Sequence, residues 1–349
     1  TGYLVMTDEN DRVNISGDFI TGSVNSCEEK LTDGIMAVGG DFILDSCNSK
    51  AFAASGNHKV ILNGHSDQTV NFSSKQDSHF CGIQFANTSS GEIVLSGTVR
   101  AIGKVENTNS VLSGWLYLAS SAIIENGSIS ANIWFPNGCS LNNDIIINGD
   151  LATDGSLSLN GHKLTVNNLE VRSTNVRLDR GQLVCNGNLH LKNPHWYYTY
   201  IEMRYPEDRV VVNGNFVSEN GNYYTMTDGI LEIKGDFEQK YKNISHANEA
   251  NFTASNNHKV IFSGAQKQTI TFESDKSYFN IVEINNTSAE GVVVSDSFNH
   301  SELYIQRGNL TLSDGSMVGE KLNADKIVSN LYLGAGEYDL NGYTLTVTG

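Results

Sequence analysis

The chain has 349 residues, with 33 glycines, 3 prolines and 18% charged residues. Disordered chains usually carry more charge and more proline, so this composition favours an ordered protein. The formal net charge of −16 argues against nucleic acid and anionic membranes as partners, because both would repel the chain. No run of about 18 apolar residues occurs, so we predict that the chain does not insert directly into a membrane.

A short signature recurs along the chain, in which two small polar residues precede Phe or Leu. Its occurrences in chain order are 17–19, 40–42, 149–151, 167–169, 187–189, 214–216 and 235–237. Neighbouring occurrences lie roughly 18 to 27 residues apart, which is the size of one turn of a β-helix built from short strands.

Each repeat combines a strand signal with a turn signal. Runs such as 210–212 and 230–233 are β-branched or aliphatic and favour strands, and the Asn-Gly or Gly-Asp pairs that follow them favour turns. Residues 156–159 alternate polar with apolar, as a strand with one buried face does. The pattern predicts an all-β fold, a right-handed parallel β-helix (β-solenoid) with irregular loop insertions. A hairpin-built sandwich is the alternative, but signals for tight hairpins are missing.

The chain also contains a longer internal repeat, in which segments of its first half recur in its second half. The segments 54–61, 68–72 and 159–166 reappear as 254–261, 268–272 and 340–347. We predict one continuous solenoid over 1–349, with internal copies at approximately 3–166 and 200–347 and an irregular junction at 190–208. Because the sequence starts and stops inside repeats, we expect a piece of a longer protein that carries flanking domains.

The segment 58–64, followed by Gln68, Phe80 and Asn87, resembles a repeat module of large bacterial secreted and surface proteins. The segment 159–166 resembles the strand-turn-strand step of filamentous adhesins with β-helix stalks. The resemblance implies a secreted or cell-surface location and a structural or adhesive role, in which the segment displays or spaces other domains. It implies a host or environmental surface, glycans or other proteins as partners. It implies no catalytic motif.

Recurring acids are the candidates for catalysis, because β-helix enzymes that degrade polysaccharides need clustered carboxylates. These acids are Asp11, Asp33 and Asp41, which reappear as Asp208, Asp228 and Asp236. A single catalytic cleft would not be duplicated, and aspartate at a turn bonds nearby backbone, so we interpret them as turn residues. We predict no catalytic residues and no enzyme; a polysaccharide lyase or glycoside hydrolase of the β-helix type stays open as the second alternative function.

Candidate metal ligands are few. Calcium would suit Asp8, Glu9 and Asp11, which offer hard oxygen ligands in a predicted loop, as does the segment 142–144. The second copy does not repeat the first of these segments, and we predict no cofactor. His58 and His258 recur without suitably spaced partners, so we expect them at turns or on the surface.

The chain has 5 cysteines, with no closely spaced pair of the kind that binds zinc. A disulfide between Cys27 and Cys47 is open on sequence grounds. The alternative, which we favour, is that the thiols fill the core as small apolar groups.

The segment around the junction holds the aromatic residues that best suit ligand binding, since flat rings stack on sugars. They are Trp196, Tyr197, Tyr198, Tyr200 and Tyr205. The alternative is that these rings cover the core at an irregular coil. We expect Trp115, Tyr117 and Trp134 to pack as ordinary strand residues. A carbohydrate-binding β-helix is therefore the first alternative to the structural or adhesive role.

Overall fold

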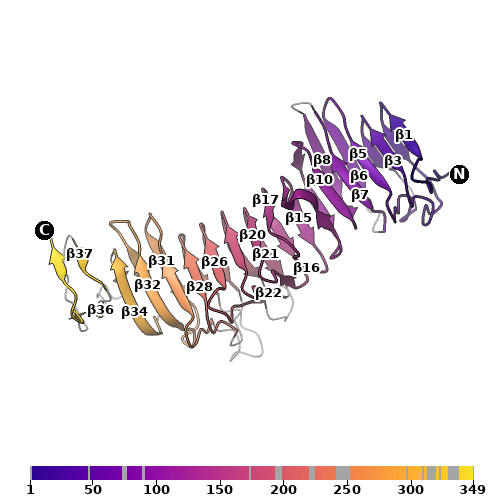
Figure 1. Ribbon diagram of the computed structural model, residues 1–349. Coiled ribbons are helices and arrows are strands. Elements are labelled where there is room, and N and C mark those ends of the chain that lie inside the picture. The colour runs from indigo at the N-terminus through magenta and orange to yellow at the C-terminus, as the bar shows by residue number, and fades with distance from the viewer. Residues whose placement is uncertain are drawn as a thin grey trace. The chain divides into compact units, whose positions relative to one another are not determined.

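The computed structural model describes residues 2–45, 48–72, 77–88, 91–172, 174–192, 199–219, 225–240, 252–295, 298–308, 310–312, 320–321, 324–328 and 338–348. These residues form short strands that pair in parallel with the next turn of the chain, and their one helical element is the 3-10 turn η1 (Glu125–Gly127). The predicted all-β, parallel β-solenoid is confirmed (Figure 1).

The chain forms two compact units. The first comprises 1–139 with 144–153, and the second comprises 140–143 with 154–349. Strand β16 (Cys139–Ser140) spans the sequence boundary between them. The prediction of two long copies in one continuous solenoid stays a prediction.

The first unit has three main stacks of parallel strands (Figure 1). One consists of β1 (Arg12–Ile15), β3 (Ile35–Val38), β5 (Lys59–Leu62), β7 (Gly82–Phe85), β10 (Lys104–Asn107) and β13 (Ile123–Ile124). The next consists of β2 (Phe19–Thr21), β4 (Phe42–Leu44), β6 (Gln68–Phe72), β8 (Glu92–Gly97) and β11 (Val111–Ser113). The last includes β9 (Val99–Ala101), β12 (Trp115–Leu118), β15 (Asn132–Phe135) and β18 (Leu151–Thr153). A further pair is β14 (Ser128–Ile129) with β17 (Ile145–Ile147).

The second unit repeats this arrangement. One long stack consists of β20 (Lys163–Val166), β23 (Gln182–Cys185), β26 (Arg209–Val212), β28 (Ile230–Ile233), β30 (Lys259–Phe262), β32 (Phe279–Asn285) and β34 (His300–Arg307). The other consists of β21 (Leu169–Arg172), β24 (Leu189–Lys192), β27 (Phe216–Ser218), β29 (Phe237–Gln239), β31 (Gln268–Phe272), β33 (Val292–Val294) and β35 (Leu310–Thr311). Shorter ones are β19 (Leu157–Ser158) with β22 (Asn175–Arg177) and β25 (Tyr200–Glu202), β36 (Glu320–Lys321) with β38 (Tyr338–Asp339), and β37 (Lys326–Val328) with β39 (Leu345–Val347).

Apolar side chains stack in columns inside each unit. In β3, β5 and β7 half-buried and buried residues alternate, so every second side chain points into the core. The register places Met36, Val60 and Ile83 directly opposite one another in successive coils. Phenylalanine rings fill the width of the coil, as shown by Phe42 and Phe80, whose ring centroids lie 5.0 Å apart. The core is thus a chain of thin layers, each closed by the coil above and below.

The recurring small-polar signature forms a ladder of side-chain to backbone hydrogen bonds. The Oδ1 of Asp18 accepts from the backbone N–H of Asp41 at 2.8 Å, and the Oδ1 of Asp41 accepts from that of Thr69 at 2.7 Å. In the second unit Asn188 and Asn215 continue the same pattern, at 2.8 and 2.9 Å to the next coil. Each coil therefore uses this residue to hold the next coil in register.

A buried glutamine fixes a second turn in each long copy. Gln68 donates to the backbone carbonyls of Val38 and Gly40, and its Oε1 accepts from Gly64 N–H and the Asn87 amide. Gln268 makes the same four bonds with Ile233, Gly235, Gly264 and Asn286. The segments that the two copies share thus include the side chains that join adjacent coils.

Candidate functional site

The duplicated acids are engaged by the backbone, as the turn interpretation expects. Asp33 accepts from Gly34 N–H at 2.9 Å and Asp228 accepts from Gly229 N–H at 2.8 Å. Asp208 accepts from three backbone N–H groups, those of Arg180, Arg204 and Tyr205. Burial nevertheless raises the pKa of Asp208, because desolvation outweighs these bonds. Together with the Asp18–Asp41 ladder, these contacts give the recurring acids a structural role.

The calcium candidates form a self-contained turn. Asp11 Oδ2 accepts from the backbone N–H groups of Thr7 and Asp8, at 2.8 and 3.0 Å. Hydrogen bonds from Asn10 to Asp8 lower the pKa of that carboxyl. Among the described residues no group of three or more His, Cys, Asp or Glu side chains is arranged to hold a metal ion. The Glu9 carboxylate has no hydrogen bond or ion pair with a described residue, so calcium binding at Asp8, Glu9 and Asp11 stays a prediction from the sequence.

The expectation for the recurring histidines, a turn or a surface position, is met in part. Each closes a turn, in which the backbone N–H of His58 or His258 donates to the carbonyl of Ser55 or Ser255. Their side chains, however, are completely buried and not on the surface. Neither ring nitrogen of either residue has a hydrogen-bond partner among the described residues. Burial lowers the pKa to about 4 for His58 and to about 3 for His258, so both rings are neutral at neutral pH. Lys59 and Lys259, one position along, lie half-buried on the outer side of the strand, whereas the two histidine side chains are buried.

The predicted aromatic loop lies partly beyond the described residues, which omit Trp196, Tyr197 and Tyr198. Tyr200 is half-buried in β25, where it pairs with Asn175. The guanidinium of Arg180 covers the ring of Tyr205, with 3.9 Å from the guanidinium carbon to the ring centroid. The two described tyrosines therefore already contact the solenoid, and the loop as a binding site stays a prediction.

The cysteine prediction is met in part. Cys27, Cys139 and Cys185 are buried, and burial raises the pKa of the Cys139 thiol to about 11. Cys81 is half-exposed. Cys47 lies outside the described residues, so its pairing with Cys27 stays open.

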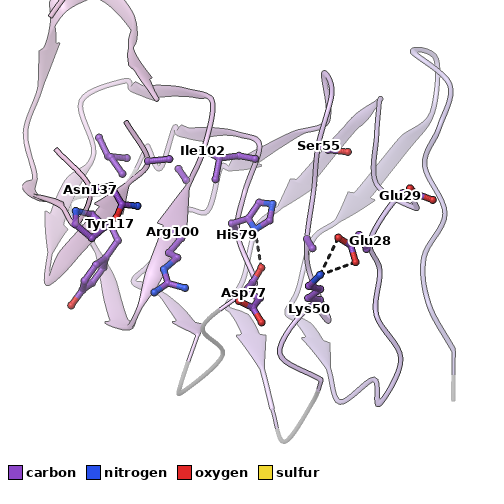
Figure 2. Close-up of a pocket in the computed structure, with 15 residues that line it drawn as sticks. Glu28, Glu29, Lys50, Ser55, Asp77, His79, Arg100, Ile102, Tyr117 and Asn137 are labelled. Atoms are coloured by element: carbon purple, nitrogen blue, oxygen red, sulfur yellow. Dashed lines mark hydrogen bonds and ion pairs between the residues drawn. The ribbon is translucent and has the colours of Figure 1, made fainter. Parts of the chain in front are cut away.

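A candidate site is a groove in the first unit, with a volume of about 750 Å³. Its lining comes from six successive coils and includes Glu28 and Glu29, Lys50, Asp77 and His79, Arg100, Tyr117 and Asn137. Figure 2 shows Lys50, Asp77, Arg100 and Tyr117 side by side along it, one from each of four neighbouring coils. We call this feature the coil groove.

Strand register brings the central residues of the coil groove together. Ala53 bridges to His79, and Phe80 bridges to Ala101, which sets His79 beside Arg100. Arg100 pairs with Tyr117, and Tyr117 pairs with Trp134. Neighbouring parallel strands lie about 4.8 Å apart, so this column advances by that distance at each coil.

Most polar groups of the coil groove have defined partners. Lys50 Nζ forms an ion pair with Glu28 at 2.9 Å, and this bond raises the pKa of Lys50 (Figure 2). Asp77 accepts from the Ser49 hydroxyl at 3.0 Å. His79 Nδ1 donates to the backbone carbonyl of Asp77 at 2.8 Å, which leaves Nε2 as an acceptor. The guanidinium of Arg100 has no hydrogen bond or ion pair with any residue that the structure describes, although its backbone carbonyl accepts from Phe80 N–H at 2.9 Å.

The aromatic end of the coil groove is a stack of rings. Tyr117 and Trp134 lie 5.1 Å apart between centroids at an interplanar angle of 20°, and Trp115 meets Trp134 edge-on at 6.0 Å. Tyr117 lines the groove, and Trp134 of the next coil covers one face of the tyrosine ring. These three residues are in strands, as predicted, but lie half-exposed on the outer side while Leu116 and Phe135 fill the core.

No family model matches this chain, and no match was found among the curated proteins or the solved structures. Among the described residues no helix is long and apolar enough to cross a membrane. The candidate site therefore has to be judged from its own chemistry.

The coil groove was not among the predicted sites, although two features of the sequence point to it. The alternation in Trp115–Leu118 places every second residue outside, which identifies both aromatic rings as surface groups. The two long copies also differ here, because Asp77 and His79 correspond to Lys276 and Tyr278 around the shared Ser-Phe framework. Residues that change between copies are the ones that coil stacking does not need.

Proposed function

We propose that this chain is a structural and adhesive segment of a large extracellular bacterial protein, and that the coil groove is its adhesive surface and binds carbohydrate. The observation that carries the proposal is the column of His79, Arg100 and Tyr117 along the groove. In it, a guanidinium without a partner among the described residues lies beside a tyrosine ring that stacks on Trp134. Aromatic rings pack against the C–H faces of sugars, and charged donors and acceptors bind their hydroxyls.

The structural half of the proposal is supported by the shared residues of the repeats. Gln68 and Gln268 join three coils each, and Asp41 and Asp236 hold the coil that follows them. Such contacts between neighbouring turns stabilise a solenoid one coil at a time, and a binding surface then extends over as many coils as the ligand requires.

A glycan array probed with the purified chain tests this function. Wild type is expected to bind a subset of glycans, and Arg100→Ala and Tyr117→Ala are each expected to reduce that signal by roughly tenfold or more, because alanine removes the donors or the ring. Tyr304→Ala, which removes an outward tyrosine of β34 in the second unit, is the matched control and should bind as wild type does. Trp196→Ala tests the aromatic loop in parallel.

Two results would contradict the proposal. One is the absence of any bound glycan. The other is binding that neither Arg100→Ala nor Tyr117→Ala weakens while both variants retain the thermal stability of wild type. Recovery of the bound oligosaccharide uncleaved would separate binding from hydrolysis or elimination, which stays the alternative that the sequence left open.

A further inference from the structure

We infer that the coil groove binds a neutral, extended polysaccharide that lies along the stacking direction of the coils, rather than a single terminal sugar or a polyanion. The inference rests on the proposed function, because it names the ligand class and the binding mode for that same site. Three features of the groove carry it, namely its extent, its charge and its mixture of donors and acceptors.

The extent of the groove matches a chain rather than one ring. Its lining begins at Glu28 and Glu29 in the first of six coils and reaches Asn137 in the sixth. With about 4.8 Å between adjacent coils, the lining residues extend over roughly 24 Å. One coil step is close to the length of one sugar residue in an extended chain. Successive sugars can therefore meet equivalent positions in successive coils.

The charge of the groove does not suit a polyanion. Its cations are Lys50 and Arg100, and its carboxylates are Glu28, Glu29 and Asp77, so the negative groups are in excess. Lys50 is also neutralised by its ion pair with Glu28. The chain as a whole has a formal net charge of −16. A polymer with an acid on every sugar would meet repulsion along most of this length.

The donors and acceptors are arranged as sugar hydroxyls require. A hydroxyl group both donates and accepts a hydrogen bond. Arg100 supplies donors, and the neighbouring coil supplies acceptors through His79 Nε2 and the Asp77 carboxylate. Farther along, Glu29 has no side-chain partner among the described residues and adds an acceptor at the far end. The two ends of the groove can therefore be tested separately.

Titration calorimetry on the full chain with neutral oligosaccharides of two to six residues, from the cello-, xylo- and manno- series, tests the inference. In at least one series the affinity is expected to increase roughly tenfold from the disaccharide to the hexasaccharide. Raising NaCl from about 0.05 to about 0.5 M is expected to change that affinity less than about twofold, because a neutral ligand adds no long-range charge interaction. Oligogalacturonate of the same lengths is the charged comparison and is expected to bind more weakly.

Variants at the two ends distinguish a chain from a single sugar. Glu29→Ala, which removes the acceptor, is expected to remove most of the affinity that the hexasaccharide gains over the disaccharide, whereas Tyr117→Ala is expected to weaken both ligands. Equal affinity for short and long ligands, or tighter binding of oligogalacturonate, would overturn this inference and leave the proposed function standing. Absence of binding to every glycan on the array and in solution would overturn both.

Discussion

Gln68 and Gln268 each make four hydrogen bonds with one side chain, and most of these bonds join adjacent coils. Each is buried and bonds two backbone carbonyls and one backbone N–H; the carbonyls of Val38 and Ile233 also accept from the next coil. A buried polar group that loses its partner costs about 1–3 kcal/mol. The sequence repeats Gly64 and Gln68 as Gly264 and Gln268 because the turn needs this pair.

Replacing Gln268 with leucine, which is similar in size and apolar, should therefore destabilise the second unit. We expect the free energy of unfolding to fall by about 2–4 kcal/mol, since several buried groups lose a partner at once. Urea denaturation followed by circular dichroism measures the change. Gln84→Leu, on the outer side of β7, is the control and should change it by less than about 0.5 kcal/mol. Equal effects at the two positions would show that the buried bonds contribute little.

His58 and His258 are the opposite case, because they are buried polar groups without hydrogen-bond partners among the described residues. Phe52 packs against His58, with ring centroids 5.8 Å apart. Burial lowers the pKa to about 4 for His58 and about 3 for His258, although Asp33 and Asp228 oppose the shift. The ordinary pKa of 6.5 applies in the unfolded chain. Between these values the unfolded state holds more protons than the folded state.

Stability should consequently decrease as the pH drops below about 6.5, by about 1.4 kcal/mol per pH unit for each histidine, and continue to do so until the folded pKa is reached. Comparing urea denaturation at pH 7.5 and pH 5.5 keeps most carboxylates ionised. The double variant His58→Leu and His258→Leu should lose much less stability than wild type across this interval. If both proteins lose the same amount, the buried rings are not the source of the acid sensitivity.

At the level of the structural elements, the turn between adjacent strands depends on how closely coils approach. Gly40 precedes the Asp41 of the ladder, and a Cβ at Gly40 would lie 2.6 Å from the backbone carbonyl carbon of Gly17 in the previous coil. Gly17 itself, in the first described copy of this turn, has no heavy atom within 4 Å of a Cβ position. The same signature therefore tolerates a side chain at one coil and excludes it at the next.

This contrast yields a matched pair of variants. Gly40→Ala is expected to lower the free energy of unfolding by about 2–4 kcal/mol, because backbone must move to accommodate the methyl group. Gly17→Ala, in the same motif, is expected to change it by less than about 1 kcal/mol. Thermal unfolding of both proteins measures the difference. If both variants lose a similar free energy of unfolding, the conformational freedom of the backbone, and not the close approach of the coils, explains why position 40 is glycine.

The elements were predictable from sequence to the extent that the repeats determine them. Strand runs, turn glycines and the Asp–Asn ladder recur at the coil period, and they indicated the parallel solenoid and the structural role of the acids. The coil groove was not predicted, because its residues are brought together only by strand register. His79, Arg100 and Tyr117 are separated along the chain and align through pairing that no local pattern encodes. The burial of the histidine rings was missed because the sequence places each histidine beside a turn but does not say to which side its ring points.

At the scale of the whole molecule, the division into two compact units means that ligand binding should stabilise the first unit and not the second. All residues that line the coil groove belong to the first unit. A ligand that binds only the folded form of that unit stabilises it by about 2.7 kcal/mol at a concentration 100 times its Kd. In a solenoid each coil contacts mainly its neighbours, so this stabilisation should be concentrated in the coils that the ligand contacts.

Hydrogen exchange measured by mass spectrometry can resolve this local stabilisation. With a saturating oligosaccharide from the array, peptides covering 77–88 and 99–137 are expected to exchange more slowly, while peptides covering 259–295 in the second unit should be unchanged. The same ligand should leave Arg100→Ala unprotected, since the variant lacks the donors that hold it. Protection confined to 259–295, where Lys276 and Tyr278 replace Asp77 and His79, would instead assign the adhesive surface to the second unit.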